Sequence, residues 1–290
     1  MNILSYLCTF MELSVVVPVY RSAKNAVVHL PLIIETFRHK YRNFEVLFII
    51  DYHDMNSEMD SFIELCEKYS ETKIHALNKN YGQHFATLCG YYLAQGDFIA
   101  CVDEDMSEYM LEICKTDDYK NQDVFYFYYN KNEMYNSSVR KFFSVLYKYL
   151  IGKIVNLKKH STFRIISKEL RDKILIEKHY YWNLDVMAYD NTKKIDGITI
   201  LNCNITDDNS TYNYKKLLKI AFEIAYENNP IFMNILFSFL PTVLFYFVTK
   251  NSIITILFYA LLVVFTSVFF KLIKKKTTTT TDKILAALKK

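Results

Sequence analysis

Short apolar runs alternate with stretches of helical periodicity over the first hundred residues, and this alternation restricts the possible folds more than any other feature of the chain. The apolar runs cover residues 13–19 (LSVVVPV), 44–50 (FEVLFII) and 97–102 (DFIACV), and residues 73–77 predict a further short strand before the last of them. The helical periodicity covers residues 25–40, 57–70 and 83–95. Strands that alternate with helices pair in parallel through right-handed crossovers, and continuous apolar runs are typical of strands buried on both faces. The sequence therefore predicts an α/β domain with a mostly parallel, Rossmann-like sheet.

Polar side chains follow three of these runs, at the point where each predicted strand ends. They are Tyr20–Ser22, Asp51–Asp54 and Asp103–Asp105. Parallel strands present their carboxyl ends at one edge of the sheet, where such domains bind ligands. We therefore expect the three groups to lie together and to form a binding site.

Asp103 and Asp105 are two carboxylates one residue apart at the end of the fourth predicted strand. Both can address one divalent cation, and oxygen atoms are the ligands that Mg²⁺ or Mn²⁺ prefers. A cation held there would neutralise the charge of a bound diphosphate. Because D-x-D spacing is common in proteins, it is a weak indication of a metal site when taken alone.

The pattern is less regular beyond residue 105. Residues 124–129 (VFYFYY) predict a further strand, residues 139–155 a basic amphipathic helix, and residues 160–176 a short strand followed by a helix. Residues 177–212 are polar and irregular, and their pattern does not place any element.

Two stretches near the C-terminus, residues 231–249 and 252–270, contain no charged side chain. Each is about long enough to cross a hydrocarbon core of roughly 30 Å, so we predict a transmembrane helical hairpin over residues 230–273. A hairpin buried in a soluble core is the alternative. Lysines gather after the second stretch, at residues 271 and 274–276, while Lys250 alone lies in the turn. The positive-inside rule then places both termini and the predicted α/β domain in the cytosol, as at a bacterial inner membrane.

The segments around the hairpin have a basic composition. Residues 213–229 predict a juxtamembrane amphipathic helix in the lipid interface, with an ordinary domain helix as the alternative. Residues 274–290 predict a basic cytosolic tail, in which we expect the threonine run at 277–281 and the residues after it to be mobile.

Residues 1–10 carry no signal-peptide pattern, and translation that begins at Met11 would make them a non-native leader. Both start sites stay open.

Composition narrows the possible partners. A net charge of +4 is too small to indicate nucleic-acid binding, and only five glycines are present, which argues against a glycine-rich phosphate loop. The six cysteines show no C-x-x-C spacing, and reduced thiols in a cytosolic protein are the simplest interpretation.

Four segments occur in an order that resembles the family 2 glycosyltransferases of GT-A fold. They are residues 13–20, 44–54, 77–105 and 161–167. Within that family the chain looks most like the polyprenyl-phosphate glycosyltransferases. The group's N-x-G, D-x-D, F-R-L-type and S-x-Y motifs match Asn80–Gly82, Asp103–Asp105, Phe163–Ile165 and Ser210–Tyr212. The resemblance covers residues 13–270 and implies a catalytic GT-A domain over residues 11–212.

The resemblance implies a role for each matched residue. Asp51 would recognise the nucleotide base, with Pro18 and Tyr20 beside it. Asp103 and Asp105 would bind the metal and the diphosphate. Arg164 would lie near the phosphates, where a guanidinium can bind two oxygens at once.

Several positions depart from the family pattern. Ile50 stands where the family usually has the first of two aspartates, and Arg21–Ala23 replace its N-E-E. Residues 106–109 replace a proline-rich stretch, and Ser161 and Thr162 stand where an acidic residue often precedes F-R. These departures leave the sugar and the acceptor open.

We expect an inverting enzyme that moves a sugar from a nucleotide-diphosphate sugar to a polyprenyl phosphate, at a membrane whose lipids it contacts. An alternative enzyme would extend a lipid-linked oligosaccharide during surface polysaccharide assembly. That reaction needs a catalytic base, for which Asp185 is a candidate. A third possibility is a non-catalytic membrane scaffold. His84, at the start of a predicted helix, could reach a phosphate, and the alternatives are that its side chain is solvated or caps its own helix. The hairpin is a candidate for self-association.

Overall fold

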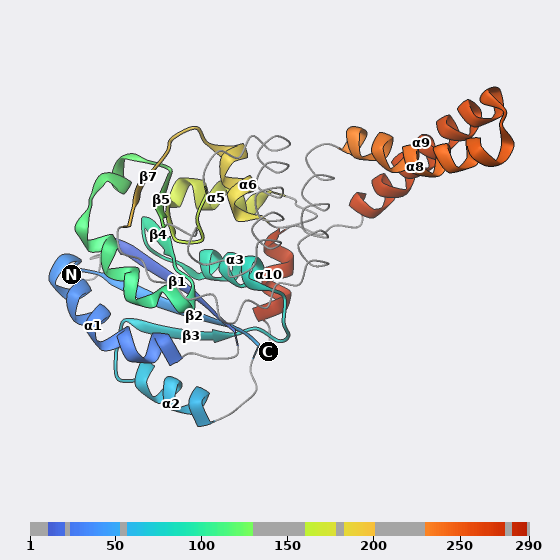
Figure 1. The fold of residues 1–290 in the computed structure, drawn as a ribbon. Helices are drawn as coiled ribbons and strands as arrows, with labels where there is room; N and C mark the ends of the chain where they lie inside the picture. Colours follow the sequence, from blue (N-terminus) through green and yellow to red (C-terminus); the bar gives the residue numbers. More distant parts are fainter. Residues whose placement is uncertain are drawn as a thin grey trace, which may run out of the picture.

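The computed structural model describes residues 11–20, 24–52, 57–129, 160–177, 183–200, 230–275 and 280–288. Within these ranges one mixed sheet carries helices on both faces, and a helical hairpin extends away from it (Figure 1). Several predicted segments lie outside the described residues: the leader at 1–10, the helix at 139–155, the S-x-Y motif at 210–212 and the interface helix at 213–229.

Seven strands form the sheet within the described part of the chain, in the order β3-β2-β1-β4-β6-β5-β7. They are β1 (Leu13–Tyr20), β2 (Phe44–Tyr52), β3 (Thr72–Ala76), β4 (Phe98–Cys101), β5 (Val124–Tyr128), β6 (Arg164–Ser167) and β7 (Ile195–Thr199). Only β6 is reversed, because it pairs antiparallel with both β4 and β5 while the other pairings are parallel. The predicted α/β class with a mostly parallel sheet is confirmed.

Helices cover both faces of the sheet. One face carries α1 (Lys24–Lys40), α2 (Ser57–Cys66) and the 3₁₀ helix η2 (Glu104–Lys115), with the short 3₁₀ helix η3 (Asp118–Asn121) after it. The other face carries α3 (Gln83–Leu93), α5 (Lys168–Ile176), α6 (Leu184–Asn191) and α10 (Thr280–Leu288). The sequence pattern did not predict η2, α6 or β7, and the second helix ends at Cys66, four residues earlier than expected.

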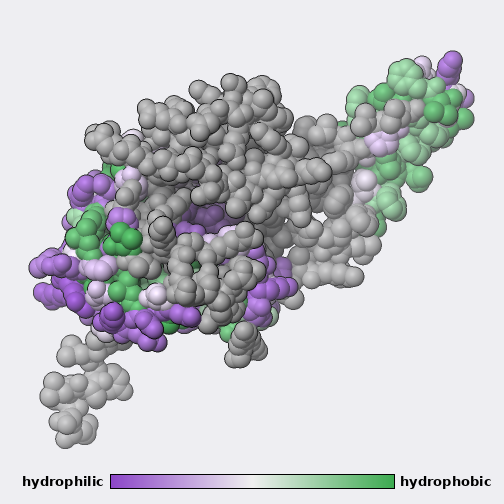
Figure 2. All heavy atoms as spheres, turned by 60° about the horizontal axis from the view of Figure 1, so that its bottom comes forward, coloured by the Kyte–Doolittle hydropathy of each residue, from purple (hydrophilic) through white to green (hydrophobic). Residues whose placement is uncertain are grey.

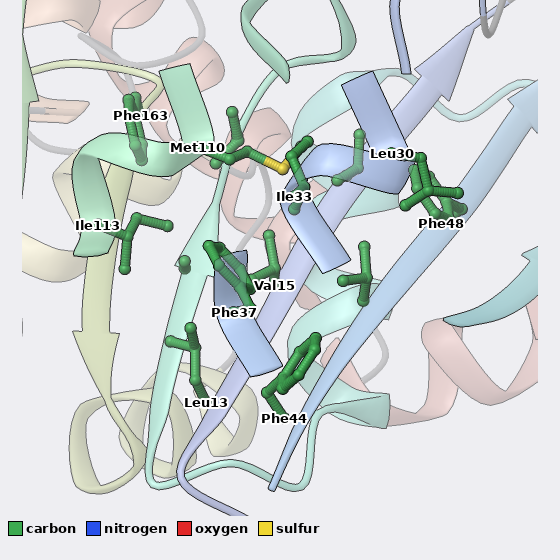
Figure 3. Packing of buried hydrophobic residues seen from close by; sticks show 14 of the residues in the cluster. Leu13, Val15, Leu30, Ile33, Phe37, Phe44, Phe48, Met110, Ile113 and Phe163 are labelled. Carbon is green, nitrogen blue, oxygen red and sulfur yellow. The ribbon is translucent and has the colours of Figure 1, made fainter. Parts of the chain in front are cut away.

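Alternation along the strands decides which face each side chain meets. Leu13, Val15, Val17 and Val19 of β1 are buried against α1 and η2, whereas Val16 is buried under α3. Figure 3 shows the first of these two cores, where Phe37 of α1 lies beside Leu13 and Val15. Since consecutive strand residues face opposite sides, each helical layer receives a complete apolar surface.

Helix α3 approaches the sheet very closely at Gly90. A Cβ placed on Gly90 would lie 2.1 Å from Cγ1 and 3.0 Å from Cγ2 of Val16 on β1. No side chain larger than a hydrogen therefore fits between α3 and β1 at this point. The contact therefore sets how closely α3 packs on β1.

A buried carboxylate ties the opposite end of the sheet together. Glu45 of β2 is 1% exposed and accepts hydrogen bonds from the Ser14 hydroxyl at 2.6 Å and from the Gln95 backbone N–H at 2.8 Å. Lys73 of β3 donates to its other oxygen at 2.8 Å. These bonds join three strands and the turn before β4, at the edge away from the predicted site.

The two charge-free stretches form the antiparallel helices α8 (Pro230–Thr249) and α9 (Ser252–Lys275). Asn251 starts α9, because its side-chain oxygen accepts from the backbone N–H groups of Ile253 and Ile254. Phe245 and Phe258 stack across the pair at 4.2 Å between ring centroids. Apolar side chains cover much of the outside of the hairpin (Figure 2). By combined length and hydropathy, none of the helices in the described ranges qualifies to span a bilayer. The transmembrane hairpin stays a prediction.

The expectation of a mobile tail is wrong over residues 280–288. These residues form α10, which packs against α3 and α5 (Figure 1). Ile284 and Ala287 are almost fully buried, at 0% and 1% exposure. The apolar pair at a spacing of three residues places both side chains on one face of a short helix, so the tail ends on the domain rather than in solvent.

We predict that Gly90→Ala lowers the free energy of unfolding by about 1–3 kcal/mol, because overpacking forces neighbouring side chains to move. Urea denaturation monitored by circular dichroism measures the change. Val16→Ala removes the two methyl groups that crowd this position, so the double variant should lose less stability than the sum of the two single variants. Simple additivity of the two losses would contradict the close packing of α3 on β1.

Candidate functional site

The ends of β1, β2 and β4 lie side by side, because β1 pairs in parallel with β2 on one side and with β4 on the other. The predicted polar groups at these three strand ends are therefore brought to one edge. Glu104 connects two of them directly, since its carboxylate accepts from the Tyr20 backbone N–H at 2.8 Å. Sequence reasoning treated Glu104 only as the spacer of the D-x-D motif. Its partner lies 84 residues away, so no local signal revealed the bond.

Asp51 organises the loop that precedes α3. Its side chain is 2% exposed, and its two oxygens accept from the backbone N–H groups of Tyr81 at 2.7 Å and Gly82 at 2.8 Å. Gly82 adopts a φ of 93°, a conformation that glycine reaches without steric cost. The N-x-G motif is thus held to β2 by an aspartate in the last two residues of that strand. Recognition of a nucleotide base by Asp51 stays a prediction.

Asp103 meets the first residue of α3. The Gln83 side-chain amide donates to Oδ1 of Asp103, which is partly buried. The N-terminus of a helix carries a partial positive charge and free N–H groups, both of which suit phosphate. The arrangement therefore places a carboxylate and a helix N-terminus at the same edge of the sheet. Gln83 was missed by the sequence analysis, although it follows the N-x-G motif directly.

The predicted metal site lies only partly within the described residues. Asp105 lies in η2, but its side chain is outside the described set. Among the side chains that are described, no group of three or more could hold a metal ion. The donor chemistry of Asp103 fits Mg²⁺ or Mn²⁺, so joint binding of one cation by Asp103 and Asp105 stays a prediction.

Pro18 and Tyr20 occupy the end of β1 as expected. Pro18 is buried and pairs in register with Ile49 of β2, while Tyr20 is partly exposed at the edge. The pairing with β2 is irregular at this point, because Val19 pairs with Ile50 whereas Tyr20 pairs with Tyr52. Both residues therefore lie beside the strand that carries Asp51, as their predicted role next to a nucleotide base requires.

Arg164 reaches this region because β6 is reversed. The first residue of β6 pairs with Cys101, the last residue of β4, which lies two positions before Asp103. Arg164 is 2% exposed and forms an ion pair with Asp185 of α6. It also donates to the Tyr91 hydroxyl at 3.4 Å. The Arg164 guanidinium is therefore buried and bonded to Asp185 and Tyr91.

Asp185 is the centre of a buried polar cluster. Its Oδ1 accepts from Arg164 and, at 3.0 Å, from the Tyr126 hydroxyl. Burial by itself would raise the pKa of Asp185, but the positive charge of Arg164, with smaller effects of His160 and His84, holds it below the usual value. Burial lowers the pKa of His84 to about 4, against the opposing effect of Asp185. The cluster thus contains an ionised aspartate–arginine pair beside a neutral histidine.

The structure joins two residues that sequence reasoning considered separately. Arg164 was predicted as a phosphate ligand and Asp185 as a candidate base, yet here each is the other's main partner. Tyr91 and Tyr126, which complete the cluster, were not predicted because buried tyrosines in strands and helices resemble ordinary core residues. The contact between Arg164 and Asp185 depends on the packing of α6 against the sheet, and no sequence spacing encodes it.

We predict that Asp185→Ala lowers the free energy of unfolding by about 3–5 kcal/mol, because it leaves the buried guanidinium of Arg164 without a counter-charge. Chemical denaturation measures the loss. Glu112→Ala removes the exposed pair with Lys115 and should change stability by less than about 1 kcal/mol. Arg164→Met combined with Asp185→Leu should recover most of the loss, since it removes both charges. Equal losses of stability in Asp185→Ala and Glu112→Ala would refute a buried ion pair.

Comparison with known proteins supports the domain assignment. Residues 14–112 match the family model described as glycosyl transferase family 2. Undecaprenyl-phosphate 4-deoxy-4-formamido-L-arabinose transferase of Pectobacterium atrosepticum is 29% identical over 116 residues, which are 38% of this chain and 34% of that protein. The aligned region therefore spans about a third of the length of this curated relative.

Solved structures of low sequence identity align with about three quarters of the chain. S. aureus TarS residues 1–349, in complex with UDP-GlcNAc, is 17% identical, with 76% of this chain and 68% of that chain covered and a TM-score of 0.47. Glucosyl-3-phosphoglycerate synthase from Mycobacterium tuberculosis, with Mn²⁺, UDP and phosphoglyceric acid, is 11% identical, with 76% and 78% covered and a TM-score of 0.46. Similarity at this level transfers no ligand to the chain. The match to the family model carries the assignment, and residues 14–112 form a domain of glycosyltransferase family 2.

Proposed function

We propose that the chain is an inverting glycosyltransferase that moves a sugar from a nucleotide-diphosphate sugar to a polyprenyl phosphate. The observation that carries this proposal is the family 2 match, which runs from β1 to η2 and so includes Asp51 and Asp103. Both carboxylates meet the start of α3, one through the loop before it and one through Gln83.

The donor would bind at the edge formed by β1, β2 and β4. Pro18, Tyr20 and Asp51 are the candidates for contact with the nucleotide. Asp103 and Asp105 would hold Mg²⁺ or Mn²⁺ against the diphosphate, and the metal would neutralise charge on the leaving group. Arg164 would act on the phosphates through the field of its charge, because its guanidinium is bonded to Asp185.

The bonds that Asp185 makes in the buried cluster favour a phosphate acceptor over a hydroxyl acceptor. The phosphate oxyanion needs no strong base at neutral pH, so positioning and charge neutralisation provide most of the catalysis. Asp185, the candidate base for a hydroxyl acceptor, is already bonded to Arg164 and Tyr126. The matched relative is named for transfer to undecaprenyl phosphate. Both observations favour the lipid phosphate over extension of a lipid-linked oligosaccharide.

Calorimetric titration of UDP and GDP, each with and without Mn²⁺, tests the donor site. We expect metal-dependent binding of one of them, and Asp103→Asn should weaken it at least about tenfold, or 1.4 kcal/mol. Asp60→Asn on the outside of α2 is the matched control and should leave the affinity unchanged. Unchanged nucleotide affinity in Asp103→Asn would show that Asp103 does not contribute to the donor site. Failure of every nucleotide to bind would favour a non-catalytic scaffold.

We also propose that the α8–α9 hairpin anchors the enzyme in a lipid membrane, with both hairpin ends on the cytosolic side together with the catalytic domain. Apolar side chains exposed along α9 support this, since Ile253, Leu257, Leu261 and Phe265 are 65–73% exposed. The docking of α10 on the domain supports a common side for both ends of the hairpin. A site held at headgroup level would meet the phosphate of a lipid acceptor.

Flotation of the full chain with phospholipid vesicles in the absence of detergent tests the anchor. We expect the protein to float, and Leu257→Glu with Leu261→Glu to reduce flotation strongly, because two charges would enter the apolar layer. Val28→Glu with Leu32→Glu places the same charges on the exposed apolar side chains of α1 and should float like the unmodified chain. Failure of the unmodified chain to float would refute the membrane anchor.

A further inference from the structure

The chain returns to the catalytic domain after the hairpin. Helix α10 packs against α3 and α5, with Ile284 and Ala287 in the same buried cluster as Leu77 and Ile174 (Figure 1). Thr281 donates to the Leu175 carbonyl at 3.0 Å and fixes the start of the helix on α5. A helix of nine residues is marginal in water when isolated, so this packing is what stabilises α10.

The far end of α10 is bonded to the loop that leads into α3. The backbone N–H of Asn78 donates to the Ala287 carbonyl at 3.2 Å, and its side-chain amide donates to the Ala286 carbonyl at 2.9 Å. The last carbonyls of a helix have no partner within the helix itself. Asn78 therefore caps α10, and α10 in turn fixes the position of Asn78.

The same asparagine is bonded to the site. Its side-chain oxygen accepts from the Tyr81 hydroxyl at 2.9 Å. The backbone N–H of Tyr81, and that of Gly82 after it, donate to Asp51, and Gln83 donates to Asp103. Hydrogen bonds, joined by the backbone of residues 78–83, thus connect the end of α10 with Asp51 and Asp103 of the predicted donor site.

We propose that α10 is a positioning element of the donor site, acting through Asn78. Docked α10 holds residues 78–82 in the conformation that sets the start of α3 against Asp51 and Asp103. When α10 is released, Asn78 loses two of its partners and the loop samples other conformations, so the fraction of molecules with a formed site falls. The effect on nucleotide affinity rests on the proposed function, whereas the effect on the loop does not.

The experiment compares hydrogen exchange with nucleotide affinity in the full-length chain. Ile284→Asp places a charge in the buried face of α10, and Asn78→Ala removes the bonds of the side-chain amide. Leu285→Asp is the matched control, because it puts the same charge one position along, on a side chain that is 38% exposed. Exchange of the Tyr81 and Gly82 amides is followed by mass spectrometry, and UDP and GDP affinity by calorimetry with Mn²⁺.

We expect Ile284→Asp and Asn78→Ala to accelerate exchange at Tyr81 and Gly82 and to weaken nucleotide binding by about tenfold, in proportion to the fraction of molecules with a formed site. Leu285→Asp should change neither. A chain that ends at Lys275 should show the same two defects, and a peptide of residues 276–290 added in trans should reverse them. This rescue separates a positioning role from a general loss of stability.

Each other outcome has a defined meaning. Unchanged exchange in Ile284→Asp, or faster exchange with unchanged nucleotide affinity, would overturn the proposal. If Ile284→Asp does not fold, Asn78→Ala and the peptide rescue decide the question. If the unmodified chain binds no nucleotide, the proposed function fails, and the exchange data alone then confirm or reject the coupling between α10 and the loop.

Discussion

Parallel pairing of β1 with β2 on one side and β4 on the other is the constraint on which the rest of the structure depends. It brings polar residues from three distant parts of the sequence to one edge, with β1 in the centre. The pairing is possible because β1 is apolar on both faces and buried on both. Gly90 then lets α3 approach β1 closely enough for the first turn of the helix to meet the carboxylates at that edge.

The carboxylates of the sheet and of the helices on it have different bonding partners. Glu45 and Asp51 lie on the same strand and face the same side, yet the first bonds groups at the amino edge and the second bonds the loop at the carboxyl edge. Asp185 balances the charge of Arg164 in the interior. Buried charges of this kind are tolerated only with partners. The carboxylates of the D-x-D segment lie at the carboxyl edge of the sheet, where the proposed function places the metal and the diphosphate.

Much of the fold was predictable because strands buried on both faces leave continuous apolar runs in the sequence, as in residues 13–19 and 44–50. The positions of Asp51 and Asp103 followed from the ends of those runs. The direction of β6 was not predictable, because a strand of four residues has the same pattern in either direction. Helix α10 was missed for a related reason, since nine residues that begin within a threonine run give little periodicity.

The sequence by itself determined the α/β class, the edge at which the polar residues gather and the presence of two adjacent charge-free helices. These features depend on local composition and on rules of parallel pairing that hold for any such chain. The tertiary structure alone decided that Arg164 pairs with Asp185, that Glu104 bonds to the end of β1 and that the last helix caps the loop at Asn78. Each of these contacts joins residues at least 21 positions apart, and only the packing of whole elements brings such residues within bonding distance.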